Sequence, residues 1–162
     1  MRHASGSLPL PAGRALLVLI LASAGCTSTP QASPERDAEA KQFKPRPYAA
    51  VIYVYRDEPG TALEPDETIL YVNNRLIGTT LPGGFFRFDV RAGAHLLQGY
   101  PPDTGRLKLE VRNGEIYFVS QKTAGGTSSF RLVAPETGKR DIVKCCALLE
   151  NWAPGQRPLL QP

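Results

Sequence analysis

The sequence predicts an all-β protein, an antiparallel β-sandwich of seven to eight strands with one short C-terminal helix. Two observations indicate this fold class. Short β-branched and aromatic segments recur about every 8–12 residues between residues 49 and 135, and turn residues separate them. Helical patterns do not alternate with these segments, as a parallel βαβ fold would require.

The first predicted strands have distinct patterns. Residues 49–56 ("AAVIYVYR") are apolar on both faces, which is typical of a central strand. Residues 68–72 and 75–80 flank Asn73-Asn74, a two-residue connection that favours a hairpin because Asn tolerates positive φ. Further strands are expected at residues 84–90, 95–100, 106–112, 115–123 and 128–135.

Two glycine-containing turns should form hairpins in the second half of the chain. Asn113-Gly114 is a strong hairpin signal between residues 106–112 and 115–123. The stretch "TAGGTSSF" leads into a strand and no helix, so it lacks the helix dipole of a phosphate-binding loop. We therefore interpret it as a hairpin loop.

A terminal helix is expected over residues 138–149, where apolar positions follow helical spacing. Cys145 and Cys146 are among these apolar positions, which would form a stripe on one face of the helix. We interpret them as small buried apolar groups. A disulfide between these neighbours, which a regular helix would not permit, and an intermolecular bridge are the alternatives.

The N-terminus has the features of an export signal. Arg2 and Arg14 precede an apolar run over residues 15–24, which is too short to span a membrane. Small residues then lead to Cys26, an order that resembles the lipobox of bacterial lipoproteins. We predict cleavage between Gly25 and Cys26 and lipid attachment at Cys26.

Two alternatives to lipidation remain at this point. Residues 22–24 ("ASA") also form an ordinary signal-cleavage site that would release a soluble protein, and Ser23 stands where the lipobox usually has Leu. The second alternative is a form of the protein that is not cleaved or that stays in the cytoplasm. The resemblance to lipoproteins implies the outer membrane, facing the periplasm, because Thr27 replaces the aspartate that retains enterobacterial lipoproteins in the inner membrane.

The chain divides into four predicted segments. Residues 1–25 are the signal peptide, residues 26–47 a lipidated N-terminus and flexible tether rich in Pro, Ser and Ala, residues 48–150 the sandwich with its helix, and residues 151–162 a proline-rich tail. Three cysteines leave one unpaired in an exported protein, and lipidation of Cys26 would account for it and leave Cys145 and Cys146 to the folded domain.

The order of segments resembles a known family. "AVIYVYRDE", "TILYVNNRLIGTT", "GGFFRFDVRAGAHLL" and "LKLEVRNGEIYFVSQ", with the turn residues Gly78, Gly93 and His95, are similar to small bacterial lipoproteins catalogued as domain of unknown function 2846 and, more distantly, to PEGA sandwich domains. The resemblance covers about residues 49–149. It implies a sandwich fold and an envelope location, and it implies no activity.

Charge and motifs point away from several function classes. The net charge of +4 falls to +2 without Arg2 and Arg14, and no clustered basic segment indicates nucleic-acid binding. No motif for a cofactor or for catalysis occurs, and the acidic stretch at residues 57–67 matches no calcium-loop spacing. We therefore predict no cofactor, no metal and no catalytic residue.

Three functions are compatible with this sequence. The preferred one is a non-catalytic interaction or structural module, held at the membrane by Cys26 and binding an envelope protein. The alternative is a glycan or small-ligand binder using aromatics such as Tyr100 or Trp152. An enzyme is third, because it would need His95 to act as base for Ser120 or Ser128.

Overall fold

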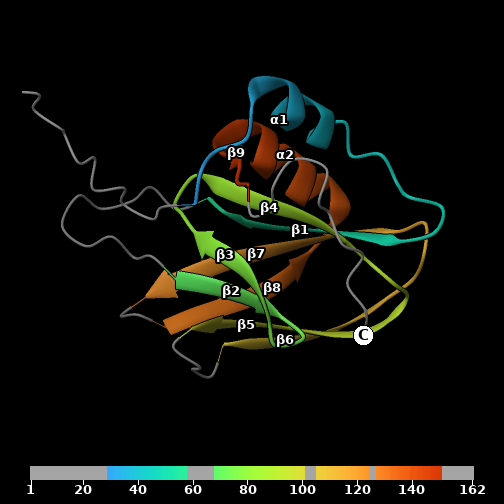
Figure 1. Cartoon of the computed structure of the whole chain (residues 1–162), viewed down its shortest axis with the longest axis vertical. Coiled ribbons are helices and arrows are strands. Elements are labelled where there is room, and N and C mark those ends of the chain that lie inside the picture. Colours follow the sequence, from blue (N-terminus) through green and yellow to red (C-terminus); the bar gives the residue numbers. More distant parts are fainter. Residues whose placement is uncertain (1–28, 58–67, 101–104, 125–126, 151–162) are drawn as a thin grey trace, which may run out of the picture.

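The computed structural model describes residues 29–57, 68–100, 105–124 and 127–150 (Figure 1). Within these ranges it contains two helices, α1 (Pro34–Ala40) and α2 (Pro135–Cys145). The strands are β1 (Ala50–Arg56), β2 (Thr68–Val72), β3 (Arg75–Thr80), β4 (Gly84–Val90), β5 (Gly93–Tyr100), β6 (Arg106–Val111), β7 (Ile116–Ala124), β8 (Thr127–Val133) and β9 (Ala147–Leu148).

The strands form two sheets, and the predicted β-sandwich with a C-terminal helix is confirmed. One sheet has the order β8-β7-β1-β4-β9 and the other the order β3-β2-β5-β6. The first sheet differs from the predicted antiparallel arrangement, because β1 pairs in parallel with β7 and β4 pairs in parallel with β9. Figure 1 shows the two helices on the side of the first sheet that faces away from the second sheet.

Strand β1 is the centre of the molecule. All seven of its residues are buried, as its two apolar faces predict. Ile52 and Val54 belong to the hydrophobic core between the sheets. Tyr53 and Tyr55 belong to a second core, which includes Ile142 of α2. The five-stranded sheet is therefore the middle one of three layers.

The turn at Asn73-Asn74 is the predicted hairpin. Both residues have positive φ, 51° and 61°, and they join the antiparallel strands β2 and β3. The hairpin expected at Asn113-Gly114 is wrong, because β6 and β7 lie in different sheets. The Gly114 amide instead donates to the carbonyl oxygens of Arg46 and Ala49, just before β1. These hydrogen bonds place the beginning of β7 beside the beginning of β1, so the two strands run parallel.

The C-terminal helix begins and ends earlier than expected. Pro135 is in its first turn, where the missing N–H costs no hydrogen bond. Gly138 lies so close to Phe118 of β7 that an added Cβ would overlap the phenylalanine side chain. The helix ends at Cys145, and the chain continues as β9 beside β4. The predicted helical stripe through Cys146 to Leu149 is therefore wrong.

Candidate functional site

The segment that follows Cys26 is part of the folded domain from Thr29 onward. We expected a flexible tether over residues 26–47, but α1 forms there, with Ser33 as its N-cap and Pro34 in its first turn. The Ser33 hydroxyl accepts a hydrogen bond from the Arg36 amide. Cys26 itself, with Gly25 and the rest of the predicted signal, lies outside the described residues.

The segment before α1 binds the chain after α2. The Ala32 amide donates to the Leu148 carbonyl oxygen over 2.8 Å, and the Glu150 amide donates to the Pro30 carbonyl oxygen over 2.7 Å. Thr29 also reaches the second sheet, where its Oγ1 accepts from the Thr79 amide over 2.9 Å. The entry of the N-terminal segment is thus fixed at the β9 edge of the first sheet.

Helix α1 is held by polar groups at both ends. Near its start, Arg36 Nη1 lies 2.7 Å from Glu150 Oε2. At its end, the Ala40 carbonyl oxygen accepts from the Tyr53 hydroxyl over 2.7 Å. The buried Arg87 side chain of β4 lies 3.5 Å from Glu39 Oε1. These contacts hold the helix against the sheet. A flexible tether would make no such contacts.

Cys145 and Cys146 form a disulfide. Our preferred interpretation, that both cysteines are free buried thiols, is therefore wrong. The alternative, a disulfide between the two neighbours, is confirmed. The helix ends between them, since Cys146 has an extended backbone. Cys146 is buried in the second core, whereas Cys145 is half-buried beside it.

His95 does not join Ser120 or Ser128. Its Nε2 lies 2.8 Å from the Arg91 carbonyl oxygen, so this nitrogen carries the proton. Its Nδ1 then accepts from Asn73 Nδ2 over 2.9 Å. His95 is buried in β5, and its hydrogen bond with Asn73 ties the β2–β3 turn to that strand.

The two serines lie on opposite faces of the first sheet. Ser128 is buried near the sandwich interior, 3.1 Å from Thr68 Oγ1 and 3.3 Å from Gln121 Nε2. Ser120 faces the helix layer, where it hydrogen-bonds Tyr55. The Tyr55 hydroxyl donates to Asp141 Oδ2 over 3.0 Å.

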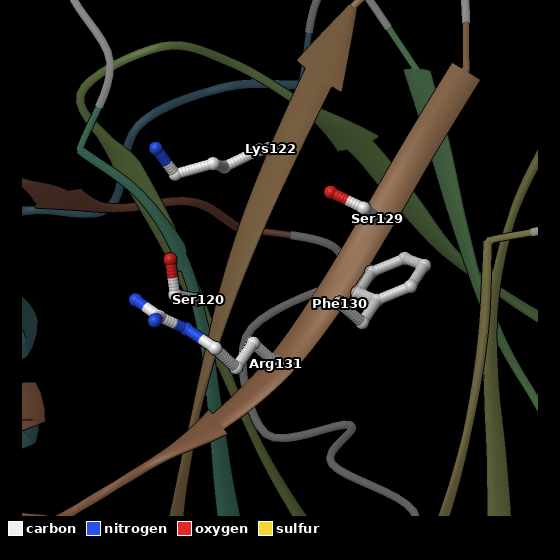
Figure 2. Close-up of a pocket in the computed structure, with 5 residues that line it drawn as sticks. All are labelled: Ser120, Lys122, Ser129, Phe130 and Arg131. Carbon is white, nitrogen blue, oxygen red and sulfur yellow. The ribbon is translucent and has the colours of Figure 1, made fainter.

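The Ser120 face also has a pocket that the sequence reasoning missed. The pocket has a volume of about 330 Å³ and is lined by Ser120, Lys122, Ser129, Phe130 and Arg131 (Figure 2). The alternation of hydroxyl and basic residues in "SQK" and "SFR" was its sequence signal. The strand register that joins them is a tertiary property.

Several residues that the sequence analysis singled out lie outside the described part of the chain. Trp152 and most of the acidic stretch fall outside the described residues, as does the side chain of Tyr100. In the described part of the chain, no group of His, Cys, Asp and Glu side chains could hold a metal ion. No helix among the described residues is long and apolar enough to cross a membrane.

Comparison with known proteins identifies a bacterial relative of this chain. No protein-family model matches the sequence. An uncharacterized protein of Haemophilus influenzae (strain ATCC 51907 / DSM 11121 / KW20 / Rd) is 34% identical over 134 residues. The alignment covers 78% of this chain and 77% of the Haemophilus protein.

Proposed function

We propose that this chain, which belongs to the same family as the Haemophilus influenzae protein, is a lipid-anchored lipoprotein of the bacterial cell envelope. In this proposal Cys26 carries the lipid, the domain faces the periplasm from the outer membrane, and the sandwich is a non-catalytic interaction or structural module. The resemblance to lipoproteins of the domain 2846 family and to PEGA sandwiches belongs to the same proposal.

The observation that carries the proposal is the sequence before Cys26. Two arginines, an apolar run of residues 15–24 and small residues precede the cysteine, which is the order of a lipoprotein signal. The other two cysteines are bonded to each other. Lipidation of Cys26 would therefore leave no odd thiol in an exported protein.

The fixed position of Thr29 gives the proposed anchor a short reach. Three residues span at most about 11 Å, whereas a coil of 20 residues would span about 25 Å. The acyl chains on Cys26 would therefore hold the β9 edge of the domain beside its leaflet. A module held this closely fits a partner that also lies at the membrane surface.

Replacing Cys26 tests the anchor. Cys26→Ala should abolish incorporation of radioactive palmitate and move the protein from the membrane to the soluble periplasmic fraction. The neighbouring Thr27→Ala is the matched control, and it should be labelled and fractionate like the native protein. Palmitate labelling or unchanged membrane association of Cys26→Ala would refute the proposal.

Thr27 provides a test of the membrane to which the protein is sorted. In an enterobacterial host, Thr27→Asp should keep the lipoprotein in the inner membrane, while Thr27→Ala should leave it in the outer membrane. Separation of the two membranes by density measures this. An identical distribution of the two variants would contradict the proposed outer-membrane location.

Crosslinking in intact cells separates the interaction module from the alternatives. Capture of a specific envelope protein by the native chain would support the module. Capture of a glycan and no protein would favour the ligand-binding sandwich. An enzyme is the least supported, because His95 uses both ring nitrogens in structural hydrogen bonds.

A further inference from the structure

The pocket on β7 and β8 is built by two cross-strand pairs. Ser120 is paired with Arg131, and Lys122 is paired with Ser129. Residues two apart on a strand point to the same face, so all four side chains lie on one side of this strand pair. Figure 2 shows Lys122, Ser120 and Arg131 extending to the same side.

The pocket combines exposed charge with a buried hydroxyl. Lys122, Ser129 and Arg131 are exposed, whereas Ser120 is only 5% exposed. Lys122 has a further interaction within the chain. Arg131 is different, since its guanidinium makes no hydrogen bond or ion pair with any residue that the structure describes. Five N–H donors of a fixed, planar group are therefore available at the pocket.

Helix α2 leaves this part of the sheet uncovered. Gly138 packs on Phe118, and Asp141 bonds Tyr55, the strand neighbour of Ser120. The Asp141 carboxylate is itself occupied, because its Oδ1 accepts from Arg140 and its Oδ2 accepts from Tyr55. Both oxygens of the Asp141 carboxylate are thus already paired with other groups.

We propose that this pocket binds a phosphate-type oxyanion. A guanidinium matches a phosphate in a bidentate fashion, and the Lys122 ammonium and the Ser129 hydroxyl add donors around the remaining oxygens. Two basic groups suit the charge of a phosphate monoester better than that of a single carboxylate. The proposal does not depend on lipidation of Cys26.

The position of the pocket bears on the source of the phosphate. Strand β8 and strand β9 are the opposite edges of one sheet, separated by four strand spacings of roughly 4.8 Å each. Thr29 enters at the β9 edge. A soluble phosphorylated molecule reaches the β8 edge without competing with the anchor, whereas a headgroup would require the domain to lie flat on the leaflet.

Titration of the full chain with two probes tests the site. Inorganic phosphate, followed by isothermal calorimetry, represents the soluble source. Vesicles of phosphatidic acid, whose headgroup is a phosphate monoester, represent the headgroup and are compared with phosphatidylcholine. Here the Cys26→Ala chain is used to exclude insertion through the lipid. The variants are Arg131→Gln and Lys122→Gln. Arg106→Gln and Lys108→Gln on β6 are the controls, because they remove the same charges from exposed positions of the other sheet.

Binding of either probe should weaken about tenfold or more in Arg131→Gln, as expected for loss of a charged hydrogen bond. It should also weaken in Lys122→Gln and stay unchanged in the two β6 controls. Weakening with free phosphate indicates a soluble ligand, and weakening with anionic vesicles alone indicates a headgroup. Absence of binding to both probes, or equal weakening in the β6 controls, would overturn the proposal. Thermal unfolding confirms that each variant is folded.

Discussion

The backbone amide of Leu148 donates a hydrogen bond to the Asp37 carboxylate over 2.8 Å and thereby joins α1 to β9. The other carboxylate oxygen of Asp37 lies 2.7 Å from Lys41 Nζ. The two residues are 111 positions apart, so this contact connects the beginning of the described domain to its end. It explains why the segment after the predicted lipid site is structured.

Asp37→Ala should therefore lower the free energy of unfolding by about 2 kcal/mol, because a charge-assisted hydrogen bond is lost and the Leu148 amide loses its acceptor. Denaturant unfolding measures this. Glu136→Ala removes a carboxylate that is 87% exposed on α2, and it should change stability by no more than about 0.5 kcal/mol. Equal losses in the two variants would show that Asp37 does not hold the segment.

The sequence patterns predicted strands β1 to β8, but helix α1 and strand β9 were missed. Residues 68–72 and 75–80 match β2 and β3 because their alternation and their Asn-Asn turn are local signals. Helix α1 was missed although Ser33, Pro34 and Glu35 form a recognisable helix start, because the surrounding Pro and Ser composition favoured a tether. The stability of so short a helix comes from its tertiary contacts.

Reduction of the disulfide between Cys145 and Cys146 should have only a small effect on the free energy of unfolding. A bond between neighbours closes a very short loop, so it should contribute only about 1 kcal/mol through chain entropy. Cys146→Ser should cost about 1–2 kcal/mol more than Cys145→Ser, because only Cys146 is fully buried. Denaturant unfolding with and without reductant compares them. Equal losses in the two variants would show that the bond itself, and not burial of Cys146, determines stability.

Ionisation of Tyr55 should make the stability of the protein depend on pH in the alkaline range. Burial and the hydrogen bond to Asp141 raise the pKa of Tyr55 to about 12, from about 10 in an unfolded chain. The unfolded state therefore releases this proton first as the pH rises. The stabilisation is fully present below pH 10 and is lost as the pH rises through about 12.

Tyr55→Phe should remove this alkaline loss, and Tyr48→Phe should retain it, because Tyr48 is 86% exposed. Unfolding in denaturant at a series of pH values measures the dependence, and ultraviolet absorbance follows phenol ionisation. If Tyr55→Phe kept the alkaline slope of the native protein, another group would be responsible for it.

The β7–β8 pocket shows the limit of sequence reasoning on sites. Lys122 and Arg131 are exposed residues of two amphipathic strands, and the alternation of hydroxyl and basic residues around them does not show that the two strands are paired. They become neighbours because Lys122 is paired with Ser129 and Ser120 with Arg131. A shift of one residue in this register would move each partner to the opposite face. Register therefore had to be known before the site was visible.

Gly138 sets the distance between α2 and β7. A Cβ at this position would overlap the Phe118 side chain, which is itself buried between Tyr53 and the helix. Gly138→Ala should lower the free energy of unfolding by about 1–3 kcal/mol, although alanine is the better helix former by about 1 kcal/mol. Val143→Ala, at an exposed position of the same helix, should stay within about 0.5 kcal/mol of the native protein. A Gly138→Ala variant that is more stable than the native protein would refute this role of the contact.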